Sequence, residues 1–542
     1  MSLPKKNTST DTSQLQIPID QQEQTQLDIS QLEQWLLHAA NTIRGASDAP
    51  KFKDFILPLI FYKRLSDVFD DEFSKQIDEY GDEETARGII EADHEDALKK
   101  ERQPIVRFYI PEIYSWDKLR NHAADGHLGE FVTEAMREVA KLNPLLLGVL
   151  DVQDFNVTQS GQRTLDDDRL EALIEVLSEH RLGLQDTEPD ILGRAYEYLL
   201  RKFAEGQGQS AGEFYTPKEV GELMARLIDP KPKTNIYDPT CGSGGLLIKG
   251  MLQYLKTHPD DKSQAPHIFG QELTPTTFAM AKMNAFLHDF IDSKIEIGDT
   301  FRNPRFVSKN AKLKQFDYIV ANPMWNQKEY DEKFYSEDHW RRFTYGTPPT
   351  SSADWGWVQH MYASLKTDGQ AAIVLDTGAV SRGSGSKHSD KERDIRKKFV
   401  ENDLIEAVIL LPENLFYNTT APGIILLLNC KKPEDRKGEM LLINLSLHFE
   451  KQKPKNVLTD EGIGLCKEVY DAWESREKLS SVIRLEDAQK TDYNLSPSQF
   501  VDVGETIEHR PMNEILADLS EARIAREKAD TALEDVLREL GL

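Results

Sequence analysis

The sequence predicts an α/β protein built on a doubly wound, mostly parallel sheet, with a helical domain before it and a coiled-coil-like helix after it. Three observations support this fold class. Short apolar segments alternate with helix-length segments between about residues 210 and 450, strand-like alternation is scarce before residue 230, and the last segment shows heptad spacing. Strands separated by helix-length connections are typical of a parallel, doubly wound sheet.

The first two predicted segments are a flexible polar tail and a helical domain. Residues 1–27 are rich in Ser, Thr, Gln and Asp, and residues 28–185 carry helical patterning. Ser30 and Glu33 match a capping box, which satisfies free amide groups at the start of a helix. The apolar residues that follow recur at the spacing of one helix face, and they are Leu32, Trp35, Leu36, Ala39, Ala40 and Ile43.

The α/β domain is predicted over residues 186–480. A helix at 190–204 leads into a Gly/Gln/Ser-rich loop, after which strands and helices alternate. The predicted strands are NIYD, HIFGQE, KIEIGD, FDYIVAN, AAIVLD, LIEAVILL and GIILLLN.

The C-terminal segment, residues 481–542, contains a predicted helix at 511–541. Its mostly apolar positions step alternately by four and three residues, which is the a/d spacing of a coiled coil. They are Ile515, Leu519, Ala522, Arg526, Ala529, Leu533, Val536 and Leu540. A long terminal stripe of this kind favours a partner-docking helix, and a helix packed on its own domain is the alternative.

Charge and cysteine content exclude several classes of protein. The formal net charge is −26 over 542 residues, whereas a protein that grips DNA alone usually has a basic surface. The chain therefore either does not bind DNA or touches it locally while a partner supplies most of the grip. Three cysteines without a CxxC pair exclude a disulfide framework and a zinc knuckle, and no other metal site is predicted. With no signal sequence and no apolar run long enough to span a membrane, we expect a cytoplasmic protein.

A glycine-rich turn, YDPTCGSGG at 237–245, follows a predicted strand and opens a helix. Gly242 and Gly244 permit a tight turn and close approach of a ligand to the backbone, where the helix start offers free N–H groups. The turn is neither a G-x-G-x-x-G fingerprint nor a P-loop.

Acidic residues end the three strands that begin this domain. Asp238, Glu272 and Asp299 stand at the carboxyl ends of consecutive predicted strands, where open α/β sheets bind ligands. Glu272 is placed to accept ribose hydroxyls, Asp299 to accept an adenine amine, and Phe301 to cover the adenine ring. Because no element for holding a pyrophosphate is present, these residues suggest an adenosyl cofactor without phosphates.

Together the motifs resemble a known family. GEFYTP at 212–217, DPTCGSGG at 238–245 and ANPMWN at 321–326 are similar to those of N6-adenine methyltransferases, and more narrowly to the modification (M) subunit of type I restriction–modification systems. The resemblance implies a Rossmann-like class I methyltransferase domain that uses S-adenosyl-L-methionine. It assigns the cofactor pocket to Phe214, Tyr215, Thr216, Pro217, Asp238, Gly242, Ser243, Gly244, Glu272, Asp299 and Phe301.

The resemblance also implies partners. In this family a separate specificity (S) subunit reads the double-stranded DNA sequence, two M subunits join one S subunit, and a restriction (R) subunit can be added. We expect the helix at 511–541 and the N-terminal helical domain to dock onto the S subunit and its target.

The ANPMWN stretch predicts the chemistry. An adenine amine is a poor nucleophile because its lone pair is delocalised into the ring. The side-chain oxygen of Asn322 and the carbonyl of Pro323 would accept its N–H bonds and stabilise the developing positive charge. Trp325 would stack on a base extruded from the duplex.

Met324 stands where the family usually has a second proline, so the loop loses a φ restraint. Several alternatives stay open on the sequence alone. The same site could methylate cytosine N4, RNA or a protein glutamine, or the chain could be a non-catalytic DNA-binding assembly subunit. Two basic loops are candidate DNA contacts: 326–350, with Trp340, Arg341, Arg342 and Tyr345, and 381–398, with Arg382, Lys387, Arg396 and Lys397.

Overall fold

The computed structural model describes most of the two predicted domains. The described residues are 29–43, 53–122, 127–159, 162–184, 186, 198–199, 216–308, 310, 312–328, 330–417, 419–453, 455–504, 523 and 526. The predicted tail at 1–27 and nearly all of the predicted helix at 511–541 lie outside them. The domain boundary at 185/186 stays a prediction, because residues 187–197 are not described. Within the described residues, no helix is long and apolar enough to cross a membrane.

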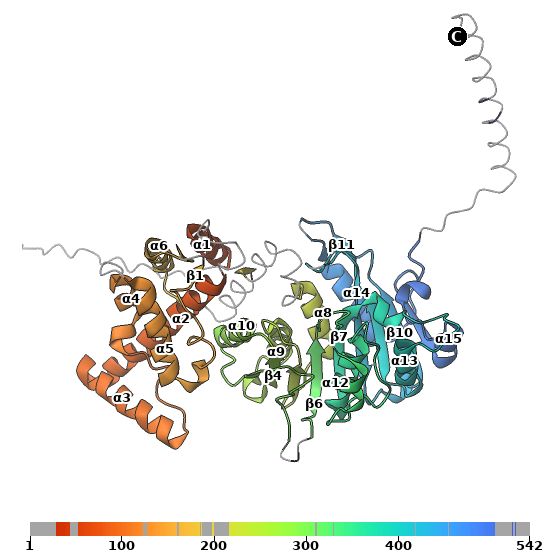
Figure 1. The fold of residues 1–542 in the computed structure, drawn as a ribbon, viewed down its shortest axis with the longest axis horizontal. Helices are drawn as coiled ribbons and strands as arrows, with labels where there is room; N and C mark the ends of the chain where they lie inside the picture. Colours follow the sequence, from red (N-terminus) through yellow and green to blue (C-terminus); the bar gives the residue numbers. More distant parts are fainter. Residues whose placement is uncertain are drawn as a thin grey trace, which may run out of the picture.

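The N-terminal domain is a helical bundle (Figure 1). Its α-helices are α1 (Ile29–Thr42), α2 (Lys53–Tyr80), α3 (Glu83–Lys100), α4 (Trp116–His122), α5 (Leu128–Leu142) and α6 (Asp167–Leu177), accompanied by two short strands, β1 (Thr158–Gln159) and β2 (Gln162–Arg163). The predicted apolar face of α1 is buried, with Leu32 and Leu36 fully enclosed. Ser30 lies inside α1 as described, so it does not occupy the predicted capping position.

The α/β domain is built on a nine-stranded sheet, and the predicted fold class is confirmed. Its strands are β3 (Asn235–Asp238), β4 (His267–Glu272), β5 (Lys294–Ile297), β6 (Phe316–Ala321), β7 (Leu365–Asp376), β8 (Ile405–Leu410), β9 (Gly423–Asn429), β10 (Glu439–Asn444) and β13 (Ser480–Arg484). Their order in the sheet is β13-β10-β8-β9-β7-β6-β3-β4-β5. Strands β3 to β7 are parallel, whereas β9 runs antiparallel to both of its neighbours.

Helices cover both faces of this sheet. They are α8 (Lys218–Ile228), α9 (Gly245–Thr257), α10 (Pro275–Leu287), α11 (Glu332–Ser336), α12 (Asp354–Ala363), α13 (Lys391–Glu401), α14 (Asp460–Ala472) and α15 (Leu485–Lys490), with a short ribbon of β11 (Phe449–Glu450) and β12 (Val457–Leu458) beside them. In β7, Ala371 and Ile373 pack into the core of α12 and α13, while Ala372 and Val374 pack into the core of α8, α9 and α14. A strand covered on both faces is apolar at successive positions, which explains why the sequence shows continuous apolar runs here.

Helix α10 joins the two domains. Met283 and Phe286 belong to the N-terminal core, whereas Phe278 and Ala281 belong to the core of the sheet. The ring of Phe286 stacks on Phe61 at a centroid distance of 5.9 Å. A helix that is apolar all round is buried on all sides, and Figure 1 shows α10 at the junction of the two domains.

The strand order reverses between β3 and β6. From β3 the chain proceeds to β4 and β5 on one side, then returns to β6 and β7 on the other. Connections leaving β3 and β6 therefore diverge, and the carboxyl ends of these two strands border a crevice. Asp238 ends β3, and Asn322 follows β6 directly.

Candidate active site

A pocket lies at this reversal point. It draws on the start of α8, the turn between β3 and α9, and the residue after β6, so it brings together six of the predicted site residues. Its lining consists of Thr216, Pro217, Lys218, Gly221, Asp238, Thr240, Cys241, Gly242, Ser243, Gly245, Leu246, Lys249 and Asn322. Phe214 and Tyr215 lie outside the described residues.

The turn between β3 and α9 has the conformation that its glycines predict. Gly242 and Gly244 have φ angles of 54° and 80°, in the left-handed region that glycine enters without strain. The amide of Asn284 in α10 donates a hydrogen bond to the carbonyl of Ser243 at 3.0 Å and thereby supports the turn. Burial raises the pKa of the Cys241 thiol, so this thiol is neutral and is not poised as a nucleophile.

Asp238 is a buried carboxyl group at the pocket wall, with 1% of its surface exposed. Its Oδ1 accepts a hydrogen bond from the backbone N–H of Thr240 at 2.9 Å. Burial raises the pKa of Asp238 to about 8; the hydrogen bond from Thr240 opposes this rise, and the nearby charge of Glu272 adds to it. A cationic group placed against Asp238 would favour its ionised form.

Glu272 connects the end of β4 to the glycine turn. Its two carboxylate oxygens accept the backbone N–H groups of Gly242, at 3.0 Å, and Thr274, at 2.9 Å. Burial raises the pKa of Glu272, and these backbone hydrogen bonds lower it. Glu272 does not line the pocket itself, but it holds Gly242, which does.

Asp299 and Phe301 lie beyond the pocket lining. Asp299 Oδ1 accepts the backbone N–H groups of Phe301, at 2.9 Å, and Arg302, at 3.0 Å. The ring of Phe301 is fully buried and stacks on Trp357 of α12 at a centroid distance of 3.8 Å. This placement differs from the predicted one, because the ring belongs to an aromatic core beside the sheet.

Asn322 is held by two hydrogen bonds. Its Nδ2 donates to Thr216 Oγ1 at 3.1 Å, and the indole N–H of Trp325 donates to its Oδ1 at 3.1 Å. Because an indole N–H can only donate, the atom of Asn322 that faces it must be the oxygen, which defines the orientation of the amide.

Pro323 and Trp325 flank this amide differently. Pro323 is buried, and Trp325 is half-buried. The Trp325 ring meets Phe416 edge to face at a centroid distance of 4.9 Å. The ring therefore lies against protein in this structure while its N–H group points at Asn322.

Two of the arginines that were candidate DNA contacts are structural instead. Arg342 and Arg396 are fully buried. Arg342 pairs with Asp338 at 2.7 Å and donates to the carbonyl of Phe301 at 2.6 Å. Arg396 donates to the carbonyl of Tyr493 at 2.6 Å. A guanidinium enclosed in this way does not reach a phosphate, so the expectation was wrong for these residues.

Four pocket residues lie outside the predicted motifs and were missed by sequence reasoning: Lys218, Gly221, Leu246 and Lys249. Gly221 lies inside α8, and a Cβ atom there would stand 3.3 Å from Cγ of Lys249 and 3.4 Å from Cδ2 of Leu246. A glycine inside a helical pattern is a signal of such close packing. The two lysines carried no comparable signal.

Comparison with known proteins agrees with the fold and the motifs. The profile of the N-6 DNA Methylase family matches residues 187–509, and that of the HsdM N-terminal domain matches residues 32–177. The chain is 36% identical over 482 residues to the type I restriction enzyme MjaVIII methylase subunit of Methanocaldococcus jannaschii, a match that covers 86% of this chain and 77% of that protein. It is 26% identical over 540 residues to the MpnII methylase subunit of Mycoplasma pneumoniae, with 94% and 96% covered.

A solved structure extends the agreement to the whole architecture. The crystal structure of the type I restriction–modification methyltransferase subunit from Streptococcus thermophilus superposes with a TM-score of 0.73 at 27% identity. The match covers 88% of this chain and all of that one. The resemblance drawn from the motifs is confirmed. The chain belongs to the N-6 DNA methylase family, among the modification subunits of type I restriction–modification systems.

Proposed function

We propose that this subunit methylates the N6 amine of an adenine that is extruded from double-stranded DNA, with S-adenosylmethionine as the methyl donor. The observation that carries the proposal is the side chain of Asn322, whose amide is oriented by Thr216 and Trp325 beside a pocket with a buried carboxyl group. The membership of the chain in the N-6 DNA methylase family supports the same reaction.

The pocket fits this donor chemically. When bound, S-adenosylmethionine supplies an electrophilic methyl group. Asp238 would hold its cationic amino group, and the raised pKa of this carboxyl suits a ligand that brings a positive charge. Gly242, Ser243 and Gly244 would allow the backbone to approach the methionine part, with Phe214, Tyr215, Thr216 and Pro217 beside it. Glu272 would accept the ribose hydroxyls.

Asp299 is the proposed partner of the adenine amine of the cofactor. Phe301 is fully buried against Trp357, so we propose that it supports the Asp299 turn from the core. This replaces its predicted role as a cover for the adenine ring.

The residues after β6 would act on the target base. A carbonyl oxygen has two acceptor sites, so Asn322 Oδ1 can keep the hydrogen bond from Trp325 and accept one from the adenine amine. The carbonyl of Pro323 would accept the second amine N–H. Asn322 is held in place before the base arrives, and the two acceptors would stabilise the positive charge that develops on nitrogen.

The proposal also includes the protein subunits with which this chain assembles. We infer that a separate S subunit reads the DNA sequence, that two copies of this chain join one S subunit, and that an R subunit can bind to the assembly. The net charge of −26 supports an arrangement in which the S subunit, and not this chain, makes most of the electrostatic contacts with the DNA phosphates. The predicted helix at 511–541 is the proposed docking element.

Transfer of a radioactive methyl group tests the function. The purified complex with its S subunit is incubated with tritiated S-adenosylmethionine and DNA that carries no methyladenine, such as host sequences amplified in vitro, and the DNA is digested to nucleosides. We expect the label in N6-methyladenine. Label in N4-methylcytosine or in protein would contradict the assignment, and so would cofactor binding without any transfer.

Asn322→Ala provides the matched test of mechanism. Loss of one charge-stabilising group of this kind lowers kcat by about 10²- to 10³-fold. The control is Asn402→Ala, because the exposed amide of Asn402, which directly follows α13, donates to the Lys398 carbonyl of that helix. Undiminished transfer by Asn322→Ala would contradict the proposed role of this amide.

A further inference from the structure

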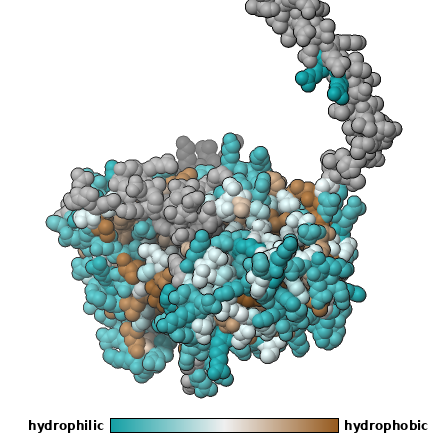
Figure 2. All heavy atoms as spheres, turned by 45° about the vertical axis from the view of Figure 1, so that its right-hand side comes forward, coloured by the Kyte–Doolittle hydropathy of each residue, from teal (hydrophilic) through white to brown (hydrophobic). Residues whose placement is uncertain are grey.

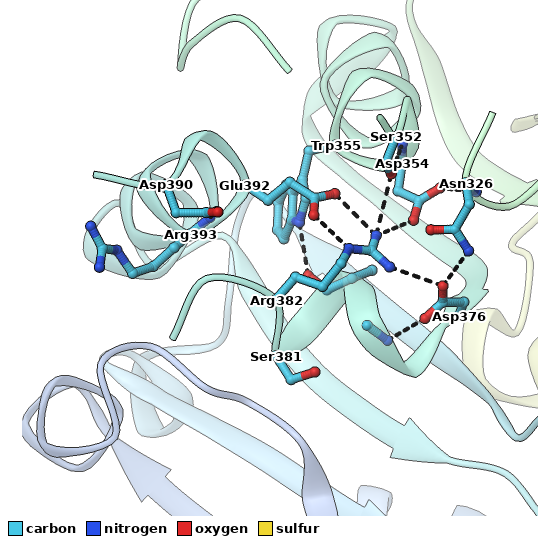
Figure 3. Close-up of polar contacts among 12 residues, drawn as sticks. Asn326, Ser352, Asp354, Trp355, Asp376, Ser381, Arg382, Asp390, Glu392 and Arg393 are labelled. Atoms are coloured by element: carbon cyan, nitrogen blue, oxygen red, sulfur yellow. Dashed lines mark hydrogen bonds and ion pairs between the residues drawn. The ribbon is translucent and has the colours of Figure 1, made fainter. Parts of the chain in front are cut away.

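A charged cluster stands next to the loop that carries Asn322. The guanidinium of Arg382 bonds to carboxylates from three elements (Figure 3): Asp376 at the end of β7, Asp354 at the start of α12 and Glu392 in α13. The distances are 2.9 Å to Asp376 and 2.5 Å to the nearer oxygen of Glu392. We call these four residues the Arg382 cluster.

The cluster holds Asn326 by both its backbone and its side chain. The backbone N–H of Asn326 donates to Asp354 Oδ1 at 2.9 Å, and its Nδ2 donates to Asp376 Oδ2 at 2.5 Å. Both carboxylates that bind Asn326 therefore also bind Arg382, as Figure 3 shows.

Asn326 is the residue at which the loop turns back. It directly follows Trp325 and has a φ angle of 55°, a left-handed conformation that asparagine tolerates better than most residues. Ahead of it, Met324 is 47% exposed and lacks the φ restraint that a second proline would supply. The loop is thus fixed before Met324 by the buried Pro323 and after it by Asn326.

Electrostatics makes the cluster depend on its arginine. Three carboxylates share one guanidinium, so removing Arg382 would leave like charges facing one another across β7, α12 and α13. A planar guanidinium with five donors can bridge several carboxylates at once, whereas the ammonium of a lysine acts as a single point charge. Arg382→Lys therefore keeps the charge and loses the geometry.

We propose that Arg382 is a positioning residue for methyl transfer: through Asp354 and Asp376 it holds Asn326, and with it the Asn322–Trp325 segment that receives the base. This inference rests on the proposed role of Asn322. Arg382, which lies 60 positions after Asn322 in the sequence, would thus supply the restraint on the loop that Met324 does not provide.

The test compares Arg382→Lys with Arg393→Lys in the complex with the S subunit. Arg393 lies in the same helix as Glu392, points away from the cluster in Figure 3, and pairs with Asp394 and Asp492. We expect Arg382→Lys to lower kcat by about 10- to 100-fold, the effect of a misplaced reacting group, with the Kd for S-adenosylmethionine within about twofold. Arg393→Lys should change neither.

Asn326→Ala keeps the test decisive should Arg382→Lys fail to fold, because Asn326 is exposed and its substitution changes none of the four cluster residues. It should lower kcat to a similar extent. If Arg382 acts through Asn326, the effects in the double variant are not additive. Additive effects, an unchanged kcat in either single variant, or a parallel loss of cofactor binding would overturn the proposal. Activity of the wild-type complex and of Asn322→Ala, measured alongside, reports separately on the proposed function.

Discussion

At the scale of single residues, the site depends on how one side-chain amide is oriented. Asn322 uses its nitrogen to bond Thr216 and its oxygen to accept from Trp325. A phenylalanine at the position of Trp325 would have no N–H group that could do this. Trp325 therefore orients the Asn322 amide, in addition to carrying the ring that is proposed to stack on the target base.

Trp325→Phe separates these two roles. The ring can still lie against Phe416, but the amide loses the donor that defines its orientation, so we expect kcat to fall about tenfold, the effect of losing roughly 1.4 kcal/mol, with an unchanged cofactor Kd. Single-turnover methylation assays measure this. Trp473→Phe is the control, since its indole bonds Glu439 at the far edge of the sheet. A variant as fast as the wild type would show that the N–H group is dispensable.

Asp238 should make cofactor binding depend on pH. Its pKa of about 8 in the free protein means that a cationic ligand must displace a proton at lower pH. Affinity for S-adenosylmethionine should rise between pH 6 and 7.5, by up to about tenfold per pH unit, with proton release measurable by calorimetry in two buffers. Asp238→Asn should bind more weakly, and its affinity should be nearly flat in pH. A wild-type affinity that does not change over this range would contradict the prediction.

The same carboxyl affects stability with a defined sign. The folded pKa lies above the unfolded value of 3.8, so the folded protein binds more protons. The contribution of Asp238 to the free energy of unfolding is therefore fully present below about pH 4 and is lost as the pH rises through 8. Urea unfolding should show that the free energy of unfolding of Asp238→Asn, relative to that of the wild type, is higher at pH 8.5 than at pH 6. An equal difference at both pH values would contradict this prediction.

At the scale of elements, α10 links the two cores. Phe286 packs between Phe61, stacked at 5.9 Å, and Phe108, edge to face at 5.7 Å. An ion pair between Arg107 and Asp289 at 2.7 Å spans the same junction, but exposed pairs contribute little. We therefore assign the stability of the domain contact to the aromatic packing.

Phe286→Ala should uncouple the domains. Truncating a buried phenylalanine costs about 3–5 kcal/mol, and here the loss falls on the contact between two cores. Differential scanning calorimetry of Phe286→Ala should show two separate unfolding transitions, whereas the two domains of the wild type should unfold together in one transition. Phe316→Ala, which removes a fully buried ring inside the sheet core alone, should lower the melting temperature without splitting the transition. A single cooperative transition in Phe286→Ala would refute the linking role of α10.

At the scale of the whole molecule, charge and partners are connected. The face in Figure 2 is mostly hydrophilic, with apolar residues in scattered groups. The guanidinium groups of Arg342 and Arg396 are buried and bonded inside the protein, so they add no positive charge to its surface. The formal net charge of the chain is −26. A division of labour with a DNA-reading partner fits this balance.

Deleting residues 511–542 tests the assembly. We expect the shortened chain to lose co-purification with the S subunit, because the heptad stripe that would form the contact is gone. The pocket lies at 216–322, so calorimetry should give an unchanged Kd for S-adenosylmethionine. Retained assembly would place the docking surface elsewhere, and lost cofactor binding would show that the deletion damages the catalytic domain.

Local patterns in the sequence determined the alternation of strands and helices, the glycine turn, and the Asn-Pro pair at the end of β6. These features depend on residues close together in the chain, so their conformation follows from φ preferences and apolar periodicity. Tertiary structure alone decided that Phe301 stacks on Trp357, that Arg342 and Arg396 are buried, and that Arg382 joins the loop after β6 to β7, α12 and α13. Each of these depends on partners from separate elements, which only the packing of the sheet and its helices brings together.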